Sequence, residues 1–328
     1  MRTIVESRRR CSILEKSKHS VKHIILYPLA AVVVLMTTLI PSAPQSVSAA
    51  SQPGGHSARN LEAAVSTLRP VTDTHADSSG NSGSVDRQAE NKKLPNRVAI
   101  IVDDFGNNMR GTEEMFKLPV KITVAVMPFL PSSEQDARRA HELGFDVLVH
   151  LPMEPRQGKP EWLGPGAVLT RMSDAEVRQR VEAALENVPY AIGINNHMGS
   201  KVTGDERVMG IVLAVCKERG LFFVDSHTNY RSVAGKIARE LGLPPVENHI
   251  FLDDVHSASH VVKQMKLVQE RALNQRYCVT IGHVGIQGKE TAAGIRSGIA
   301  GMKDSVEFIG ISELVREEWK WNSQVTLP

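Results

Sequence analysis

The sequence predicts an α/β domain in which a parallel sheet is covered by helices. From Arg97 onward, short apolar runs of strand length alternate with longer amphipathic segments whose ends carry helix-capping and helix-terminating residues. Such alternation is typical of strands joined by crossover helices, which makes neighbouring strands parallel. A closed or partly closed barrel and an open doubly wound sheet both fit this pattern. In both architectures the chemistry lies at the carboxyl ends of the strands.

The predicted strands are runs of apolar residues about four or five positions long. Residues 98–102 read VAIIV, a composition typical of a strand that is buried on both faces. Similar runs predict strands at 122–126, 146–149, 191–194, 221–224, 250–252 and 277–281, and an eighth at 306–309.

The segments between these strands have legible helix ends. The serine pair at 132–133 can cap a helix that Gly144 terminates, and Ser173 with Glu176 forms a capping box. Gly220 ends a third helix. The helices are predicted at about 132–143, 173–187, 205–219, 232–241 and 257–275.

Residues 1–49 are predicted to be an export signal. Basic residues between positions 8 and 22 precede an apolar run from 24 to about 40, and small residues then end in VSAA at 47–50. This order is typical of a secretory signal with an A-x-A type of cleavage site. An uncleaved single-span anchor is the alternative, because the apolar run is nearly long enough to cross a bilayer core of ~30 Å. In either case we expect a periplasmic or otherwise exported chain, anchored to the inner membrane if the signal is retained.

The rest of the chain divides into a linker, one domain and a short tail. Residues 50–94 are rich in Ser, Gly, Asp and His and have little apolar periodicity, so they are predicted to be a disordered linker. The domain is expected at 95–320 and the tail at 321–328. A folded part of roughly 230 residues suits one large domain.

Charge and cysteine content argue against two classes of protein, nucleic-acid binders and disulfide-rich domains. The net charge of +3 comes partly from the basic signal region, and no basic and aromatic residues interleave, so no nucleic-acid partner is expected. Cys216 and Cys278 stand in apolar surroundings, which favours buried free thiols over a disulfide framework, although a pairing stays open. The sequence predicts no oligomeric state.

Polar residues gather directly after the predicted strands. Asp103 and Asp104 follow the first strand, and Gly106 then interrupts it. Two carboxylates this close repel unless one is protonated or a cation lies between them, although an isolated Asp-Asp pair is as often a plain turn. Later strand ends carry the same residue types: HLPMEP at 150–155, NNHMGS at 195–200, DSHT at 225–228, two aspartates at 253–254 and IGHVG at 281–285.

In this order, the segments IIVDDFG, HLPMEP, NNHMGS, VDSHT, FLDD and IGHVG resemble those of the divergent polysaccharide deacetylase family, a branch of the NodB-like polysaccharide deacetylases. The resemblance covers the chain from about Arg97 to about Val315. It implies the NodB-like deacetylase fold, an irregular (β/α) barrel of about seven strands, with a metal-dependent deacetylase site.

The resemblance also implies a set of metal ligands. Asp104 matches the metal-binding aspartate and His150 the first of two metal-binding histidines, but Glu154 stands where the second histidine is expected. His197 can supply the missing imidazole, so Asp104, His150 and His197 are the predicted ligands of a divalent ion, with zinc expected. The residues expected as alternative ligands, or as supports for the ligands, are Glu154, Asn196 and Asp253.

Three further residues receive catalytic roles from the resemblance. Asp103 matches the catalytic base and His283 the general acid, and Asp225 is expected to orient the imidazole of His283. Hydrolysis of an acetyl amide or ester needs an electrophile, a base for the attacking water and an acid for the leaving group. A metal ion, a carboxylate and a protonated histidine supply these three groups.

Two functions from different classes follow. The first is a metal-dependent hydrolase that removes N- or O-acetyl groups from an envelope polysaccharide such as peptidoglycan. The second is a glycan-binding or regulatory module of the envelope with the same fold and little or no activity. The domain has no G-x-S-x-G, G-x-G-x-x-G or P-loop motif, and a glycosidase does not need three histidines at strand ends. Membrane contact is expected only through an uncleaved signal.

Overall fold

The computed structural model describes residues 95–322. The predicted export signal, the linker up to residue 94 and residues 323–328 of the predicted tail lie outside the described residues. Within 95–322, no helix combines the length and the apolar character needed to cross a membrane.

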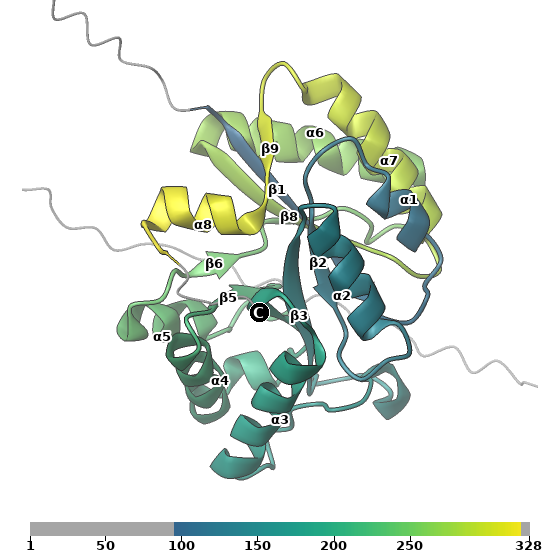
Figure 1. Ribbon diagram of the computed structural model, residues 1–328. Helices are drawn as coiled ribbons and strands as arrows, with labels where there is room; N and C mark the ends of the chain where they lie inside the picture. Colours follow the sequence, from purple (N-terminus) through teal and green to yellow (C-terminus); the bar gives the residue numbers. More distant parts are fainter. Residues whose placement is uncertain (1–94, 323–328) are drawn as a thin grey trace, which may run out of the picture. The chain divides into compact units, whose positions relative to one another are not determined.

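The described residues form one nine-stranded sheet in which every pairing is parallel. The strand order is β6-β5-β4-β3-β2-β1-β8-β7, with β9 beside β1. No pairing joins β6 to β7 in this part of the chain, so the sheet curls into a half-barrel and does not close (Figure 1). The strands are β1 Arg97–Phe105, β2 Thr123–Val126, β3 Asp146–Met153, β4 Ala191–Met198, β5 Phe222–Asp225, β6 Val246–Glu247, β7 Ile250–Phe251, β8 Tyr277–His283 and β9 Glu307–Ile309.

Helices surround the half-barrel, as the ring of coiled ribbons in Figure 1 shows. The α-helices are α1 Thr112–Phe116, α2 Ser133–Glu142, α3 Asp174–Asn187, α4 Glu206–Glu218, α5 Ala234–Leu241, α6 Ala258–Gln275, α7 Gly288–Met302 and α8 Ile311–Trp319. Two short 3₁₀ turns, Pro160–Trp162 and Val202–Gly204, lie in the loops after β3 and β4.

Strand β1 is buried on both faces, as its composition predicts. Val98, Ile100 and Val102 join the cluster between the sheet and the surrounding helices. Ala99 and Ile101 point to the opposite face and join a second cluster inside the half-barrel. The alternation follows from the two-residue period of a strand. Helix α8 contributes Ile311, Leu314 and Val315 to the inner cluster and so covers the interior of the half-barrel.

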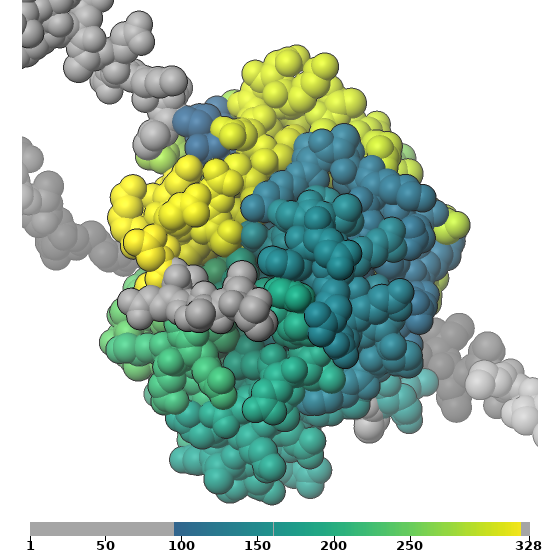
Figure 2. Space-filling view, viewed as in Figure 1, coloured from purple at the N-terminus to yellow at the C-terminus, as the bar shows by residue number. Residues whose placement is uncertain are grey.

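The first strand of the domain, β1, pairs with the last strand, β9. One edge of β1 pairs with β8 from Arg97 to Asp103. The other edge is shared, with β9 beside Arg97–Ala99 and β2 beside the residues from Ile101 onward. In Figure 2 the yellow C-terminal segment accordingly lies directly beside the blue segment that follows β1. The C-terminal part of the domain is therefore integral to the sheet.

The predicted strands and the five predicted helices are all present, and the differences have physical reasons. The strands β3 and β4 each run four residues beyond the prediction, because their final residues still pair with each other in register. Besides the two 3₁₀ turns, four elements were not predicted: the two-residue β6, the five-residue α1, and the helices α7 and α8.

Helix α7 escapes sequence-based prediction because of its glycines, which disfavour a helix in isolation. The tertiary structure explains them. A Cβ atom at Gly294 would lie 2.4 Å from Val261 Cβ, and one at Gly298 would lie 2.6 Å from Met265 Cβ. The glycines therefore allow α7 to pack closely on α6.

The prediction of buried free thiols is confirmed for the two cysteines within the described residues. Cys216 on α4 and Cys278 on β8 are buried and free, and burial raises the pKa of each thiol to about 12. They are therefore inert core residues.

Candidate metal and catalytic site

The adjacent carboxylates of Asp103 and Asp104 reach the same site because β1 is irregular at this point. Val102 pairs with Val124 and Phe105 with Val126, so two residues of β1 stand opposite one residue of β2. Asp104 has a positive φ of 69°. In a regular strand neighbouring side chains point to opposite faces, and a bulge of this kind re-aims one of them. Gly106 follows with φ 115°, where a Cβ atom would lie 2.7 Å from the Met127 carbonyl oxygen.

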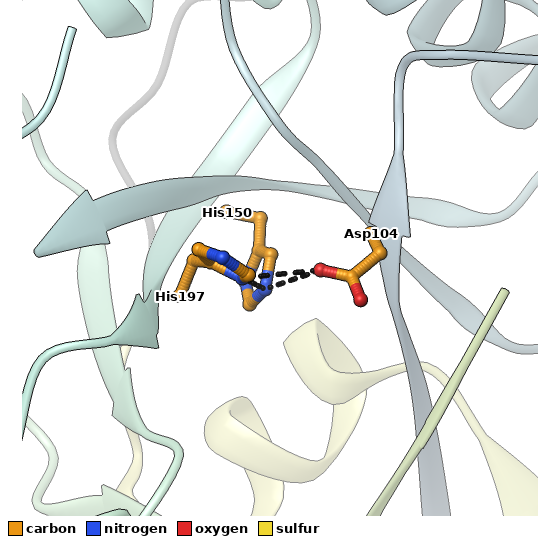
Figure 3. A group of neighbouring side chains, drawn as sticks. All are labelled: Asp104, His150 and His197. Atoms are coloured by element: carbon orange, nitrogen blue, oxygen red, sulfur yellow. Dashed lines mark hydrogen bonds and ion pairs between the residues drawn. The ribbon is translucent and has the colours of Figure 1, made fainter. Parts of the chain in front are cut away.

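Asp104, His150 and His197 bring three potential ligand atoms to one point (Figure 3). His150 on β3 and His197 on β4 face the same side of the sheet. Asp104 Oδ1 lies 3.3 Å from His150 Nε2 and 3.1 Å from His197 Nδ1. The two ring nitrogens lie 3.1 Å apart. The predicted ligand set is therefore assembled by the fold.

Each imidazole presents its free nitrogen to this point because its other nitrogen is engaged elsewhere. His150 Nδ1 lies 2.9 Å from Asn195 Oδ1, and His197 Nε2 lies 3.0 Å from the carbonyl oxygen of Trp162. Both partners are acceptors, so each ring donates its N–H there and leaves a lone pair toward the centre of the triangle. This arrangement is typical of metal-binding histidines.

The triangle fits a divalent cation. Asp104 Oδ1 is buried and accepts no hydrogen bond of normal geometry. Two imidazole lone pairs and one carboxylate oxygen would repel one another without a proton or cation between them. Ligands about 2.0–2.1 Å from a tetrahedral zinc ion are about 3.3 Å apart, close to the separations found here. Burial opposes the charged form of Asp104, but the adjacent imidazoles of His150 and His197 outweigh it and hold its pKa well below the usual range.

Asp103 stands beside the triangle as a buried carboxylate. It is 1% exposed, and its Oδ2 lies 3.6 Å from His150 Nε2. Asn195 Nδ2 donates a 2.8 Å hydrogen bond to its Oδ1. Burial raises the pKa of Asp103, although His150 and His283 partly oppose the rise. A carboxylate with a raised pKa is a better proton acceptor than an exposed aspartate.

His283 lies next to Asp103, since the two residues are register partners on β8 and β1. Asp253 holds it, because Asp253 Oδ1 lies 2.8 Å from His283 Nδ1 and Asp253 Oδ2 accepts from the His283 backbone N–H at 2.8 Å. Thr291 donates to the same Oδ2. Burial lowers the pKa of His283, but the hydrogen bond to Asp253 and the nearby carboxylates outweigh this and raise it to about 10.

The prediction that Asp225 orients His283 is wrong. Asp225 Oδ1 accepts from the backbone N–H of His227, two residues on, which is a local turn at the end of β5. In the sheet order, β5 lies between β4 and β6, whereas β8 has β7 as its neighbour. Asp253, which follows β7, is therefore the carboxylate that reaches His283.

Two of the three residues expected as alternative ligands or supports have other roles. Glu154 accepts hydrogen bonds from Thr170 and forms an ion pair with Lys201, with Nζ 2.7 Å from Oε1. Asn196 accepts from the Ser226 backbone N–H and donates to the Met198 carbonyl oxygen. Both side chains tie loops together, and neither belongs to the triangle. The third, Asp253, supports His283.

One residue of the site, Asn195, was not predicted from the sequence. Its side-chain amide lies between Asp103 and His150. Asn195 was grouped with its neighbours in NNHMGS but received no role. A signal was present in the strand period, because residues two apart share a face, so Asn195 had to lie on the same face as His197. The register that sets Asn195 opposite His150 is a property of the folded sheet alone.

A cleft of about 470 Å³ opens beside these groups. Asp104 and His283 both line it, so the ligand triangle and the histidine face one space. The apolar side chains of Phe251, Met109 and Ile286 form part of its wall, and the Phe251 ring stacks on the His283 ring with centroids 6.0 Å apart. A ligand in this cleft would reach both the triangle and His283.

Comparison with known proteins identifies related chains. A family model described as divergent polysaccharide deacetylase matches residues 100–315, more than half of the chain. An uncharacterised protein of Haemophilus influenzae is 35% identical over 222 residues, which are 68% of this chain and 78% of that protein. The uncharacterised protein YibQ of Escherichia coli is 34% identical over 190 residues, 58% of this chain and 59% of YibQ. The match therefore spans less than two thirds of YibQ.

The fold also recurs in a solved structure. The crystal structure of an uncharacterised protein from Agrobacterium tumefaciens superposes with a TM-score of 0.62 at 22% identity, covering 68% of this chain and 91% of that chain. This similarity concerns the fold, the parallel half-barrel with its surrounding helices.

Proposed function

The chain belongs to the divergent polysaccharide deacetylase family, and from this premise we propose that it is a metal-dependent hydrolase that removes N- or O-acetyl groups from an envelope polysaccharide such as peptidoglycan. One observation supports the proposal above the others. Three ligand atoms converge within 3.1–3.3 Å of one another, beside the buried carboxylate of Asp103, whose register partner is His283. Two imidazoles and one carboxylate suit zinc.

The residues around the triangle have distinct chemical roles in this proposal. A divalent ion held by Asp104, His150 and His197 would supply Lewis acidity toward the acetyl group. Asp103 accepts the proton of the attacking water as the new C–O bond forms. His283 donates its proton to the leaving amine or alkoxide oxygen as the bond to the acetyl carbon breaks.

His283 has the protonation state that this role requires. With its pKa raised to about 10, the imidazole carries its proton at neutral pH. Asp253 maintains that state through its hydrogen bond to Nδ1, and it leaves Nε2 as the donor. The cleft beside His283 has room for a leaving sugar.

The proposal is tested by metal content and turnover measured together. The purified protein should contain one divalent ion per chain by elemental analysis and should release acetate from acetylated cell-wall fragments or chito-oligosaccharides. Chelation should remove both the ion and the activity, and the ion should restore them. Metal-loaded protein that binds these glycans but releases no acetate would instead support the second function, a glycan-binding module of the envelope.

Replacing Asp253 with asparagine should change how the rate depends on pH. Asparagine removes the charge that raises the pKa of His283, so the imidazole loses its proton at lower pH. The rate should therefore start to fall at a lower pH on the alkaline side, while metal content stays at one ion. Asp225→Asn is the matched control, because the Asp225 side chain accepts from the His227 backbone N–H and not from His283, and its pH profile should equal that of the wild type. Identical profiles for all three proteins would contradict the role of Asp253.

We also propose that the chain is exported, with residues 1–49 as its signal and 50–94 as a linker. The order of basic, apolar and small residues in the sequence supports this proposal. Fractionation of the producing cells should place the protein in the periplasm or on the inner membrane, and limited proteolysis should leave a resistant core that starts near Leu94. A resistant core that begins well before residue 90 would contradict the linker.

A further inference from the structure

Asn195 lies between a metal-binding histidine and the carboxylate of Asp103. Its side chain is fully buried on β4, directly opposite His150 in the register of β3 and β4. One end of its amide lies 2.9 Å from His150 Nδ1, and the other donates to Asp103 Oδ1 at 2.8 Å. A longer contact of 3.5 Å runs from Nδ2 to Ser226 Oγ.

The two contacts allow only one orientation of the amide. An ionised carboxylate accepts hydrogen bonds and donates none, so the amide NH₂ must face Asp103. The amide oxygen then faces His150, and because that oxygen is only an acceptor, His150 must carry its hydrogen on Nδ1. The lone pair of His150 is thereby placed on Nε2, the atom that lies 3.3 Å from Asp104 Oδ1.

The same orientation distinguishes the two oxygens of Asp103. Oδ1 is engaged by the Asn195 amide, whereas Oδ2 is the oxygen turned toward the triangle, 3.6 Å from His150 Nε2. A proton taken from water at the triangle would therefore arrive at Oδ2.

We propose that Asn195 is a positioning residue with two effects: it sets the tautomer in which His150 binds metal, and it holds Asp103 so that Oδ2 accepts the proton. The effect on Asp103 rests on the proposed deacetylase function. The effect on His150 concerns metal binding alone and is independent of any turnover. An amide donates to a carboxylate and accepts from an imidazole at the same time, and Asn195 is placed to do both.

Asn195→Leu tests both effects, because leucine branches at Cγ as asparagine does and carries no polar atom. The affinity for zinc or cobalt should fall by about 10–100-fold, the usual cost of losing a group that orients a metal-binding histidine. At saturating metal, kcat should fall strongly while KM changes little, since the loss concerns groups that act on the reacting atoms. Circular dichroism and thermal unfolding would show that the variant is folded.

Asn195→Asp separates the two effects and serves if the leucine variant does not fold. The new carboxylate still accepts from His150 Nδ1, and carboxylates are common partners of metal-binding histidines, so metal affinity should stay at the wild-type value or rise. The amide donor to Asp103 is replaced by a second carboxyl group, so either repulsion displaces Asp103 or a proton shared between the two carboxyl groups makes it a weaker base, and kcat should fall in both cases. A merely structural role would not split metal affinity from kcat in this way.

Asn248→Ala is the matched control for the loss of a buried amide. Asn248 is 2% exposed and its amide bonds to Ser226 and Ile250, not to the triangle. It should lower thermal stability without changing metal affinity. A folded Asn195→Leu protein with wild-type metal affinity would overturn the effect on His150. Wild-type kcat in Asn195→Asp would overturn the effect on Asp103. A wild-type protein without turnover would contradict the proposed function. The metal affinities would then still test whether Asn195 sets the tautomer of His150.

Discussion

Replacing His150 with alanine is expected to abolish stoichiometric binding of a divalent ion. His150 supplies one of three converging ligand atoms, and its ring is held at Nδ1 by Asn195. Loss of a ligand should weaken binding by more than the ~100-fold cost of losing a residue that only orients one. Isothermal titration with zinc, together with elemental analysis of the purified variant, measures the loss.

Two matched variants complete this test. His249→Ala also removes a largely buried imidazole. Its Nδ1 accepts from the backbone N–H of Val279, which pairs with Ala99, four residues before Asp103 along β1. This substitution should lower stability and leave metal affinity unchanged. Glu154→Gln should also keep one ion per chain, because Glu154 is engaged by Lys201 and Thr170. Full metal content at wild-type affinity in His150→Ala would show that the ligand assignment is wrong.

Replacing Asp103 with asparagine is expected to cut turnover by roughly a hundredfold or more, a typical size for the loss of a general base. Asparagine has nearly the same shape as aspartate, and its oxygen can still accept from Asn195 Nδ2. The metal triangle does not include Asp103, so the ion should be retained. Acetate release at saturating metal, measured beside metal content, separates these two outcomes.

The control for Asp103→Asn is another buried carboxylate replaced in the same way. Asp136 on α2 is 5% exposed and accepts from the Gly106 backbone N–H and from Ser132 Oγ. Asp136→Asn should alter stability more than turnover. Should Asp103→Asn release acetate at the wild-type rate, the base must be another group; should it lose the metal as well, Asp103 would be a ligand.

The sequence was sufficient to predict the main elements of the fold. The run VAIIV in β1 is apolar at both odd and even positions, which only a strand buried on both faces requires, and the two clusters that it joins confirm this. The capping box of Ser173 and Glu176 marks the start of α3, where both of its hydrogen bonds are present. These are local signals, so a reader of the sequence can recognise them without knowing the neighbours of each element.

The glycine-rich helix α7 and the partner of His283 were not predictable in this way. The four glycines of α7 weaken its helical signal, and two of them, Gly294 and Gly298, allow its close contact with α6, a contact that only the folded structure shows. The choice between Asp225 and Asp253 depends on which strand lies beside β8. Both aspartates follow an apolar run, but of the two preceding strands, β5 and β7, only β7 pairs with β8.

The sequence by itself determined which residue types stand at the carboxyl ends of the strands, including Asp104, His150 and His197, because strand period and strand end are local properties of the chain. The tertiary structure alone decided how these residues meet. The bulge in β1 turns both adjacent aspartates to one site, the register of β3 and β4 sets Asn195 opposite His150, and the strand order brings Asp253 to His283. Bulges, register and strand order arise from pairings between segments far apart in the chain, and no local pattern encodes them.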